Sequence, residues 1–303
     1  MTLICVRLER TYGVPRITAL ADTRATVERG KRYEVVSDTT AKLFALPVRC
    51  YGPNLTPILG AWTDPYFQTM IGLGFSGSCF EALTVIAHVG RALSALVAPE
   101  GDTPLPTKEG LVQLISELCG RYFHAHSGFA KPYLTFLVFG FEEGRPWIGT
   151  ITCDKHNGPK SSVEWAGDDT LVTVGQDDKF RAHAEDWRNR ILKHRAGVEK
   201  KAPQDTEDGV FEKELAAAKA GIAEQKWTEA HMLQQIDTLS VELIGGVLQR
   251  LELAEENGVV YAAFTHDDRD YLGDTSVSVA NGALLGPIPI VQKMGLDSLR
   301  QRR

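Results

Sequence analysis

Short apolar segments, separated by turn residues, dominate residues 1–75 of the chain. Segments of this length with turn residues on either side are typical of strands rather than helices. The predicted strands are Thr2–Leu8, Arg16–Ala21, Arg32–Val36, Lys42–Leu46 and Gln68–Gly74. The chain therefore opens with β-structure.

Helical periodicity follows these strands. Apolar residues recur at helical spacing through Cys79–Leu96, and the same spacing returns in Lys108–Ala125 behind an acidic first turn. The sequence therefore predicts two consecutive helices after the first set of strands.

A second block of strands comes next. Pro132–Glu142 and Arg145–Cys153 flank a Glu-Gly turn and predict a hairpin, and Thr170–Val174 predicts a further strand before a helix at Lys179–His194. Strand blocks that alternate with helix blocks indicate antiparallel sheets covered by helices. The predicted fold class is therefore α+β.

The last third of the chain divides less regularly. Residues 196–212 are polar and charged and contain Pro203 and Gly209, a composition typical of an exposed linker. Helices are predicted at Lys213–Gln225 and Thr228–Glu255, then strands at Val259–Phe264, Ser276–Ala280 and Ile288–Val291. We divide the chain into a core at 1–195, a linker and helical insertion at 196–255, and strands at 256–303 that complete the core. One hypothesis for the insertion is that it caps an assembly or docks a partner.

Composition argues against several classes of function. The chain has 303 residues, 43% of them hydrophobic, and a formal charge of -6, which argues against a nucleic-acid partner. The five cysteines form no CxxC pair, so neither a zinc site nor a redox dithiol is expected, and a reducing cytoplasm is the simplest location. The first residues lack the apolar core of a signal peptide, and no run reaches membrane-spanning length, so no membrane association is expected.

Thr2 is the first candidate for chemistry. Removal of Met1 before a small residue would leave a free α-amine beside the threonine hydroxyl. The hydroxyl can then attack a carbonyl while the amine, with a pKa of about 7.7 to 8.0, accepts its proton.

Three further motifs follow Thr2 in order: ALADTRAT (Ala19–Thr26), TTAKLFAL (Thr39–Leu46) and GFSGSCFEALTVI (Gly74–Ile86). This order resembles the proteasome β-subunits and the related bacterial ATPase-dependent peptidase, of the N-terminal nucleophile hydrolase superfamily. The resemblance implies a four-layer αββα sandwich of two antiparallel sheets.

The same resemblance implies roles for individual residues. Thr2 would be the nucleophile, Lys42 the cation beside it, and Asp22 the carboxylate that orients Lys42. Gly77 would supply the backbone N–H of an oxyanion hole. Arg24 and Ser76 would give structural support.

Two later segments continue the resemblance with departures from it. TLVTVGQDDKFRAHAEDW (Thr170–Trp187) matches a family strand, turn and helix, but Gln176 stands where the family has the serine that supports the nucleophile's amine. THDDRDYLGDTSVSVA (Thr265–Ala280) points to Asp270 as the second supporting carboxylate, with Gly273 in place of a following serine. An acidic surface turn explains this last segment equally well.

The implied activity is that of a threonine-type peptidase, which needs no cofactor. The resemblance also implies a polypeptide substrate, a homo-oligomeric ring and an ATP-driven unfoldase as partner. Two alternatives remain open: a non-catalytic structural subunit of the same fold, and an N-terminal nucleophile amidohydrolase acting on a small amide.

Other motifs in the chain could indicate a dinucleotide site or a metal site. Gly72, Gly74 and Gly77 spell GxGxxG between a predicted strand and helix, but no acidic strand end follows at the spacing that a dinucleotide site requires. His124 and His126 point to different faces of a helix end, and the acidic cluster around Asp268 is typical of a solvated loop. We therefore predict no metal site.

Overall fold

The computed structural model describes most of the first 175 residues and a smaller part of the remainder. The described residues are 3–11, 14–29, 32–52, 65–125, 133–153, 158–167, 170–175, 245–246, 248–267, 277–280, 284–285 and 288–289.

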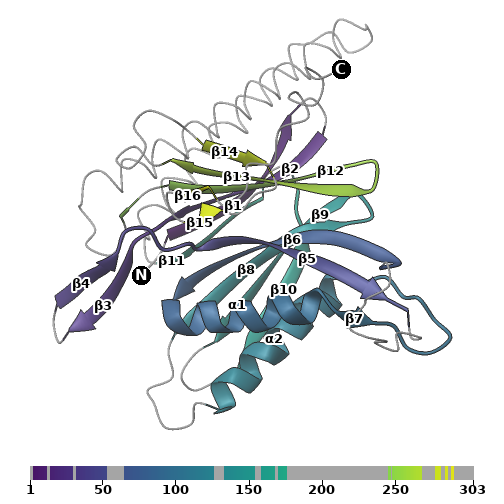
Figure 1. Cartoon of the computed structure of the whole chain (residues 1–303), viewed down its shortest axis with the longest axis horizontal. Helices are drawn as coiled ribbons and strands as arrows, with labels where there is room; N and C mark the ends of the chain where they lie inside the picture. Colours follow the sequence, from purple (N-terminus) through teal and green to yellow (C-terminus); the bar gives the residue numbers. More distant parts are fainter. Residues whose placement is uncertain are drawn as a thin grey trace, which may run out of the picture.

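Two six-stranded sheets form the body of the molecule (Figure 1). The first is antiparallel throughout and has the order β11-β1-β2-β12-β13-β14. Its strands are β1 (Leu3–Thr11), β2 (Val14–Asp22), β11 (Leu171–Gly175), β12 (Leu248–Glu256), β13 (Val259–Asp267) and β14 (Val277–Ala280).

The second sheet has the order β10-β9-β8-β6-β5-β7, and only the short β7 runs parallel to its neighbour. Its strands are β5 (Leu43–Tyr51), β6 (Phe67–Gly77), β7 (Leu96–Val97), β8 (Leu134–Glu142), β9 (Arg145–Cys153) and β10 (Lys160–Trp165). Two small hairpins complete the strands: β3 (Ala25–Arg29) with β4 (Arg32–Ser37), and β15 (Leu284–Leu285) with β16 (Ile288–Pro289).

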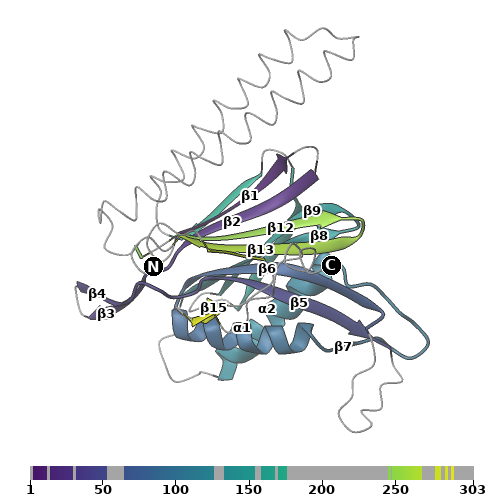
Figure 2. The ribbon, with the colours of Figure 1, turned by 45° about the horizontal axis from the view of Figure 1, so that its top comes forward.

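The two sheets lie face to face, and helices α1 (Cys79–Leu93) and α2 (Lys108–Ala125) cover the outer face of the second sheet (Figure 2). Strand β8 shows how the sequence produces these layers. Phe136 and Val138 belong to the apolar cluster beneath the helices, whereas Leu137 and Phe139 belong to the cluster between the sheets. Successive strand residues point to opposite faces, so an uninterrupted apolar strand is buried on both sides.

The α+β class is confirmed, as are all the strands and both helices predicted before residue 176. The first helix ends at Leu93 rather than Leu96, because Leu96 and Val97 pair with β5. Strands β3 and β10 were not predicted. The described residues give three layers, while the fourth stays a prediction because the helices expected at 179–194 and 213–225 lie outside them.

The helix predicted over Thr228–Glu255 is wrong at its C-terminal end. Residues 248–256 form β12, which pairs with β2 and β13 in the first sheet. Leu251 and Leu253, two positions apart, both face the core between the sheets. The pairing of β12 with its two neighbouring strands overrides the helix propensity of its leucine, glutamate and alanine residues. Strand β12 of the core sheet thus begins at Leu248, within residues 196–255, which were expected to form the linker and insertion. The rest of the domain division stays a prediction.

The GxGxxG segment has a packing explanation. A Cβ on Gly72 would lie 2.0 Å from the ring of Phe139, and one on Gly74 would lie 3.0 Å from Leu43. Strand β6 pairs antiparallel with β5 and β8, whereas a dinucleotide fingerprint requires a parallel βαβ unit. These glycines therefore let neighbouring side chains cross the strand.

Candidate active site

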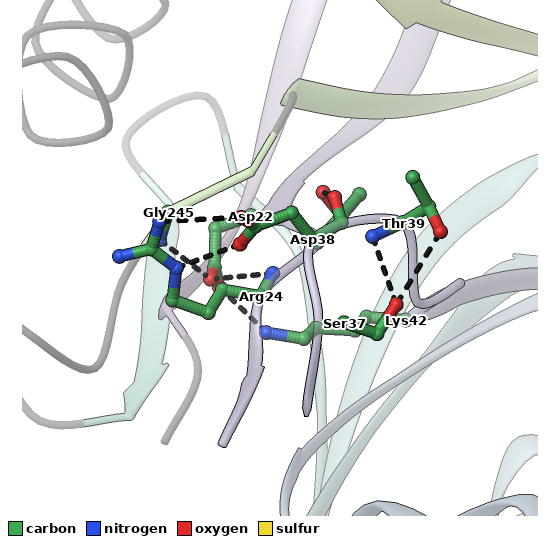
Figure 3. Close-up of polar contacts among 8 residues, drawn as sticks. Asp22, Arg24, Ser37, Asp38, Thr39, Lys42 and Gly245 are labelled. Carbon is green, nitrogen blue, oxygen red and sulfur yellow. Dashed lines mark hydrogen bonds and ion pairs between the residues drawn. The ribbon is translucent and has the colours of Figure 1, made fainter. Parts of the chain in front are cut away.

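Asp22 is the centre of a buried polar cluster at the end of β2 (Figure 3). Its carboxylate is fully buried and accepts hydrogen bonds on both oxygens. Oδ1 accepts from Leu3 N at 2.9 Å and from Lys42 Nζ at 3.0 Å. Oδ2 accepts from Gly245 N at 3.2 Å and from Arg24 N at 3.3 Å. This set of donors holds the carboxylate in one orientation.

Lys42 lies directly before β5 and is only 1% exposed. Within the described part of the chain, Asp22 is the single hydrogen-bond partner of its ammonium group. Burial lowers the pKa of Lys42 below its ordinary value of 10.5, and the attraction of Asp22 offsets that effect only in part. An ammonium carries three N–H donors, so the group keeps donors for a further acceptor.

The N-terminal strand begins at this ion pair. Leu3 N donates to the same Asp22 oxygen that accepts from Lys42. Thr2, which precedes Leu3 in the sequence, lies outside the described residues, as do Gln176 and Asp270. Their expected roles therefore stay predictions.

Arg24 fixes the turn that follows β2. Its Nε donates to Asp38 Oδ1 at 2.7 Å, and its Nη2 donates to Asp38 Oδ2 at 3.4 Å. The guanidinium also packs on Gly245, where a Cβ would lie 2.2 Å from Arg24 Cζ. Arg24 also donates its backbone N–H to Asp22 Oδ2, and the structural role expected for it stays a prediction.

Sequence reasoning missed Gly245 and Gln249. Gly245 N bonds to Asp22, and Gln249 Oε1 accepts from Lys42 N at 2.8 Å and from Leu43 N at 3.3 Å. Both residues fall within the stretch that was assigned to a helix, where they had no reason to meet a strand end more than 200 residues earlier. The Gly-Gly pair at 245–246 was the available signal, because adjacent glycines mark a turn.

Ser76 and Gly77 lie on β6, the strand beside Lys42. Phe75 N donates to Lys42 O at 3.2 Å, so Gly77 is two residues farther along β6, roughly 7 Å at the usual strand rise. Ser76 is 3% exposed and pairs with Thr135 in β8. The described residues thus bring Asp22, Lys42 and Arg24 into contact and place Ser76 and Gly77 on the neighbouring strand.

Gly77 cannot accept a side chain without rearrangement of the backbone. Its φ is 116°, and a Cβ would lie 2.1 Å from Tyr133 O. We expect Gly77→Ala to lower the free energy of unfolding by about 2 kcal/mol beyond the cost of the positive φ, since forcing extra atoms into a closely packed site costs about 1–3 kcal/mol. Urea denaturation would measure the loss. Gly101→Ala is the matched control, because Gly101 also has a positive φ but has no atom near its Cβ position. Equal losses in the two variants would contradict the steric explanation.

Cys79 opens α1 within electrostatic range of Lys42. Burial raises the pKa of the Cys79 thiol, and the charge of Lys42 opposes this shift without reversing it. The thiol is therefore neutral at physiological pH, and a neutral thiol is a poor nucleophile. Cys79 is therefore a neutral neighbour of Lys42 and does not suit the role of nucleophile.

The described residues contain neither a metal-binding cluster nor a membrane-spanning helix. There, no group of three or more histidine, cysteine, aspartate or glutamate side chains is arranged to hold a metal ion. Over those residues, too, no helix combines the length and the apolar character needed to cross a bilayer.

Comparisons with known proteins give a loose likeness in structure only. No family model matches the sequence, and no curated protein matches it. The Anbu complex of Pseudomonas aeruginosa, solved as a helical assembly, is 14% identical with a TM-score of 0.45, covering 89% of this chain and 89% of its own. Anbu (ancestral beta-subunit) from Yersinia bercovieri is 10% identical over 93% and 88% of the two chains, with a TM-score of 0.45. A Gly-1 mutant of Anbu from Hyphomicrobium sp. strain MC1 is 16% identical over 92% and 87%, again with a TM-score of 0.45.

These findings overturn the expected membership of the proteasome β-subunit family. A member would be expected to match a family model or a curated relative, and this chain matches neither. Identities of 10% to 16% at a TM-score of 0.45 carry no family assignment and no activity. The short motifs around Asp22, Lys42 and Gly77 are explained here by a turn, a buried ion pair and a close backbone contact. Any function must therefore be argued from the geometry of the site.

Proposed function

We propose that this chain hydrolyses amide bonds of polypeptides as a threonine-type peptidase, with Thr2 as nucleophile once cleavage before it frees its α-amine. One observation carries the proposal. The buried Lys42 ammonium is held by an Asp22 oxygen that also accepts from Leu3 N, the residue directly after Thr2.

A buried ion pair of this kind has no clear benefit for stability alone. Removing two charges from water costs several kcal/mol for each ion, and apolar side chains of similar volume usually serve a core as well. Buried groups with shifted pKa values are concentrated at functional sites, where they serve proton transfer or stabilise charge. A lysine with a lowered pKa beside the start of a strand therefore supports a catalytic role.

The proposed chemistry uses four residues. The Thr2 hydroxyl attacks the substrate carbonyl carbon and passes its proton to the Thr2 α-amine, while Lys42 stabilises the developing negative charge near the hydroxyl. The protonated amine then donates its proton to the leaving nitrogen, the C–N bond breaks, and an ester to Thr2 remains. Water, deprotonated by the same amine, hydrolyses the ester and releases the carboxylate. Asp22 holds Lys42 throughout, and the N–H of Gly77 is the proposed donor to the oxyanion.

The expected assembly is a separate question. The homo-oligomeric ring, the ATP-driven unfoldase and the cytoplasmic location were inferred from the sequence and stay predictions. Size-exclusion chromatography with light scattering would measure the mass of the assembly directly.

The decisive experiment is intact mass spectrometry of the purified native protein before and after treatment with a peptide epoxyketone, which reacts with both the hydroxyl and the free amine of an N-terminal threonine. We expect a mass that begins at Thr2 and a single adduct that is absent from Thr2→Ala. A retained Met1 with no adduct would contradict the proposal and favour a non-catalytic structural protein. An adduct without cleavage of any peptide library would favour an amidohydrolase for small amides.

A further inference from the structure

We propose that Gln249 is a positioning residue of this site, which fixes the main chain of Lys42 so that its ammonium meets Asp22. The inference deepens the proposed function and rests on it for its catalytic meaning. Gln249 is 1% exposed and lies on β12, in the first sheet, whereas Lys42 leads into β5 in the second. Its side chain therefore spans the space between the sheets.

The contact satisfies backbone groups that strand pairing leaves open. Lys42 O accepts from Phe75 N, so its carbonyl is bonded within the sheet. The N–H groups of Lys42 and Leu43 instead donate to the single oxygen Gln249 Oε1, at 2.8 and 3.3 Å. Buried N–H groups require an acceptor, and an amide oxygen has two lone pairs to offer.

An uncharged acceptor suits this position. A carboxylate at residue 249 would also accept both hydrogen bonds, but it would place a second negative charge near the Lys42 ammonium. That charge would compete with Asp22 for the ammonium and stabilise its protonated form. Glutamine holds the backbone and leaves Asp22 as the only anion that bonds to Lys42 among the described residues.

The same stretch of chain also holds Asp22. Gly245 N donates to Asp22 Oδ2, and Leu248 is the β12 residue directly opposite Asp22 in the sheet. Residues 245–249 therefore fix the carboxylate at one end and the main chain of the lysine at the other. The geometry of the ion pair depends on how this stretch is placed.

The test is an NMR titration of Lys42 in full-length protein labelled with 15N-lysine, with Lys42→Met used to assign its signal. In Gln249→Met, which keeps the side-chain length but removes the acceptor, we expect the main chain of Lys42 to shift and its ammonium to reach water. Its titration should then move to higher pH, closer to 10.5, because burial is the largest cause of its lowered pKa and outweighs the loss of Asp22. Gln249→Asn, which keeps the amide but is one methylene shorter, should shift the titration in the same direction by a smaller amount.

Leu251→Ala is the matched control, because Leu251 is a fully buried residue of the same strand that packs in the core between the sheets and has no polar side-chain atom to bond to the site. Its stability should fall while the Lys42 titration stays where it is in the wild type. An unshifted titration in both Gln249 variants would overturn the proposal and leave Gln249 as a packing residue. The titration requires neither Thr2 nor a substrate, so it decides the role of Gln249 even if the epoxyketone experiment fails.

Discussion

Lys42→Met is expected to slow epoxyketone labelling of Thr2 by roughly 100- to 1000-fold, the usual loss when one group that stabilises developing charge is removed. Methionine keeps most of the length of the buried side chain and removes its charge. Asp22 keeps its three backbone donors, Leu3 N, Arg24 N and Gly245 N, so the turn around it should survive. Intact mass spectrometry over a time course would give the labelling rate.

Lys108→Met is the matched control for this variant. Lys108 is 8% exposed and pairs with Glu142 at 3.3 Å, so it is a similarly enclosed lysine with a carboxylate partner. It stands at the start of α2, where its ammonium pairs with Glu109 and Glu142 rather than with any group of the candidate site. We expect its labelling rate to match the wild type. Equal labelling of Lys42→Met and wild type would remove Lys42 from the mechanism.

Asp22→Asn is expected to lower the free energy of unfolding by about 3–5 kcal/mol, the typical cost of removing one partner from a buried ion pair. The substitution leaves the Lys42 ammonium without its counter-ion. It also replaces one acceptor oxygen with an NH₂ group that faces backbone N–H donors. Urea denaturation followed by circular dichroism would measure the loss.

The comparison for this variant is Asp38→Asn. Asp38 pairs with Arg24, but its side chain is 47% exposed, so water screens the interaction. Exposed ion pairs contribute at most about 1 kcal/mol, and we expect a loss in that range. A loss in Asp22→Asn as small as that in Asp38→Asn would contradict the prediction, because it would show that the buried Lys42 ammonium does not need its counter-ion.

The fold was predictable from the sequence where burial is complete. Strands such as β8 are marked by a continuous apolar run between turn residues, and helices such as α1 by apolar periodicity. Neither signal needs knowledge of the partners. Strand β12 was not predictable in this way, because LQRLELAEE carries good helix formers and becomes a strand only between β2 and β13. Strand β10 was missed since most of its side chains are exposed and leave no apolar pattern.

The site was predictable only for residues that lie near one another in the sequence. Asp22, Arg24 and Lys42 lie within 20 positions of one another, and the expectation that Asp22 holds Lys42 came from the resemblance of their short motifs. Gly245 and Gln249 reach them through sheet pairing and a side chain that crosses between the sheets, which no local pattern encodes. The family resemblance drawn from the same short motifs was wrong, because turns and buried pairs of this size recur in unrelated chains.

The position of β12 in the first sheet affects the order in which the chain gains its site during synthesis. Asp22 and Lys42 leave the ribosome early. Their hydrogen-bond partners come much later in the sequence: Gly245 lies 223 residues after Asp22, and Gln249 lies 207 residues after Lys42. Contacts so distant in sequence form late, because a long loop must close before they give any stabilisation. A nascent or truncated chain that lacks β12 therefore carries Asp22 and Lys42 without the contacts that fix them. Under the proposed function, such a chain would acquire its hydrolytic site only once β12 has joined the first sheet.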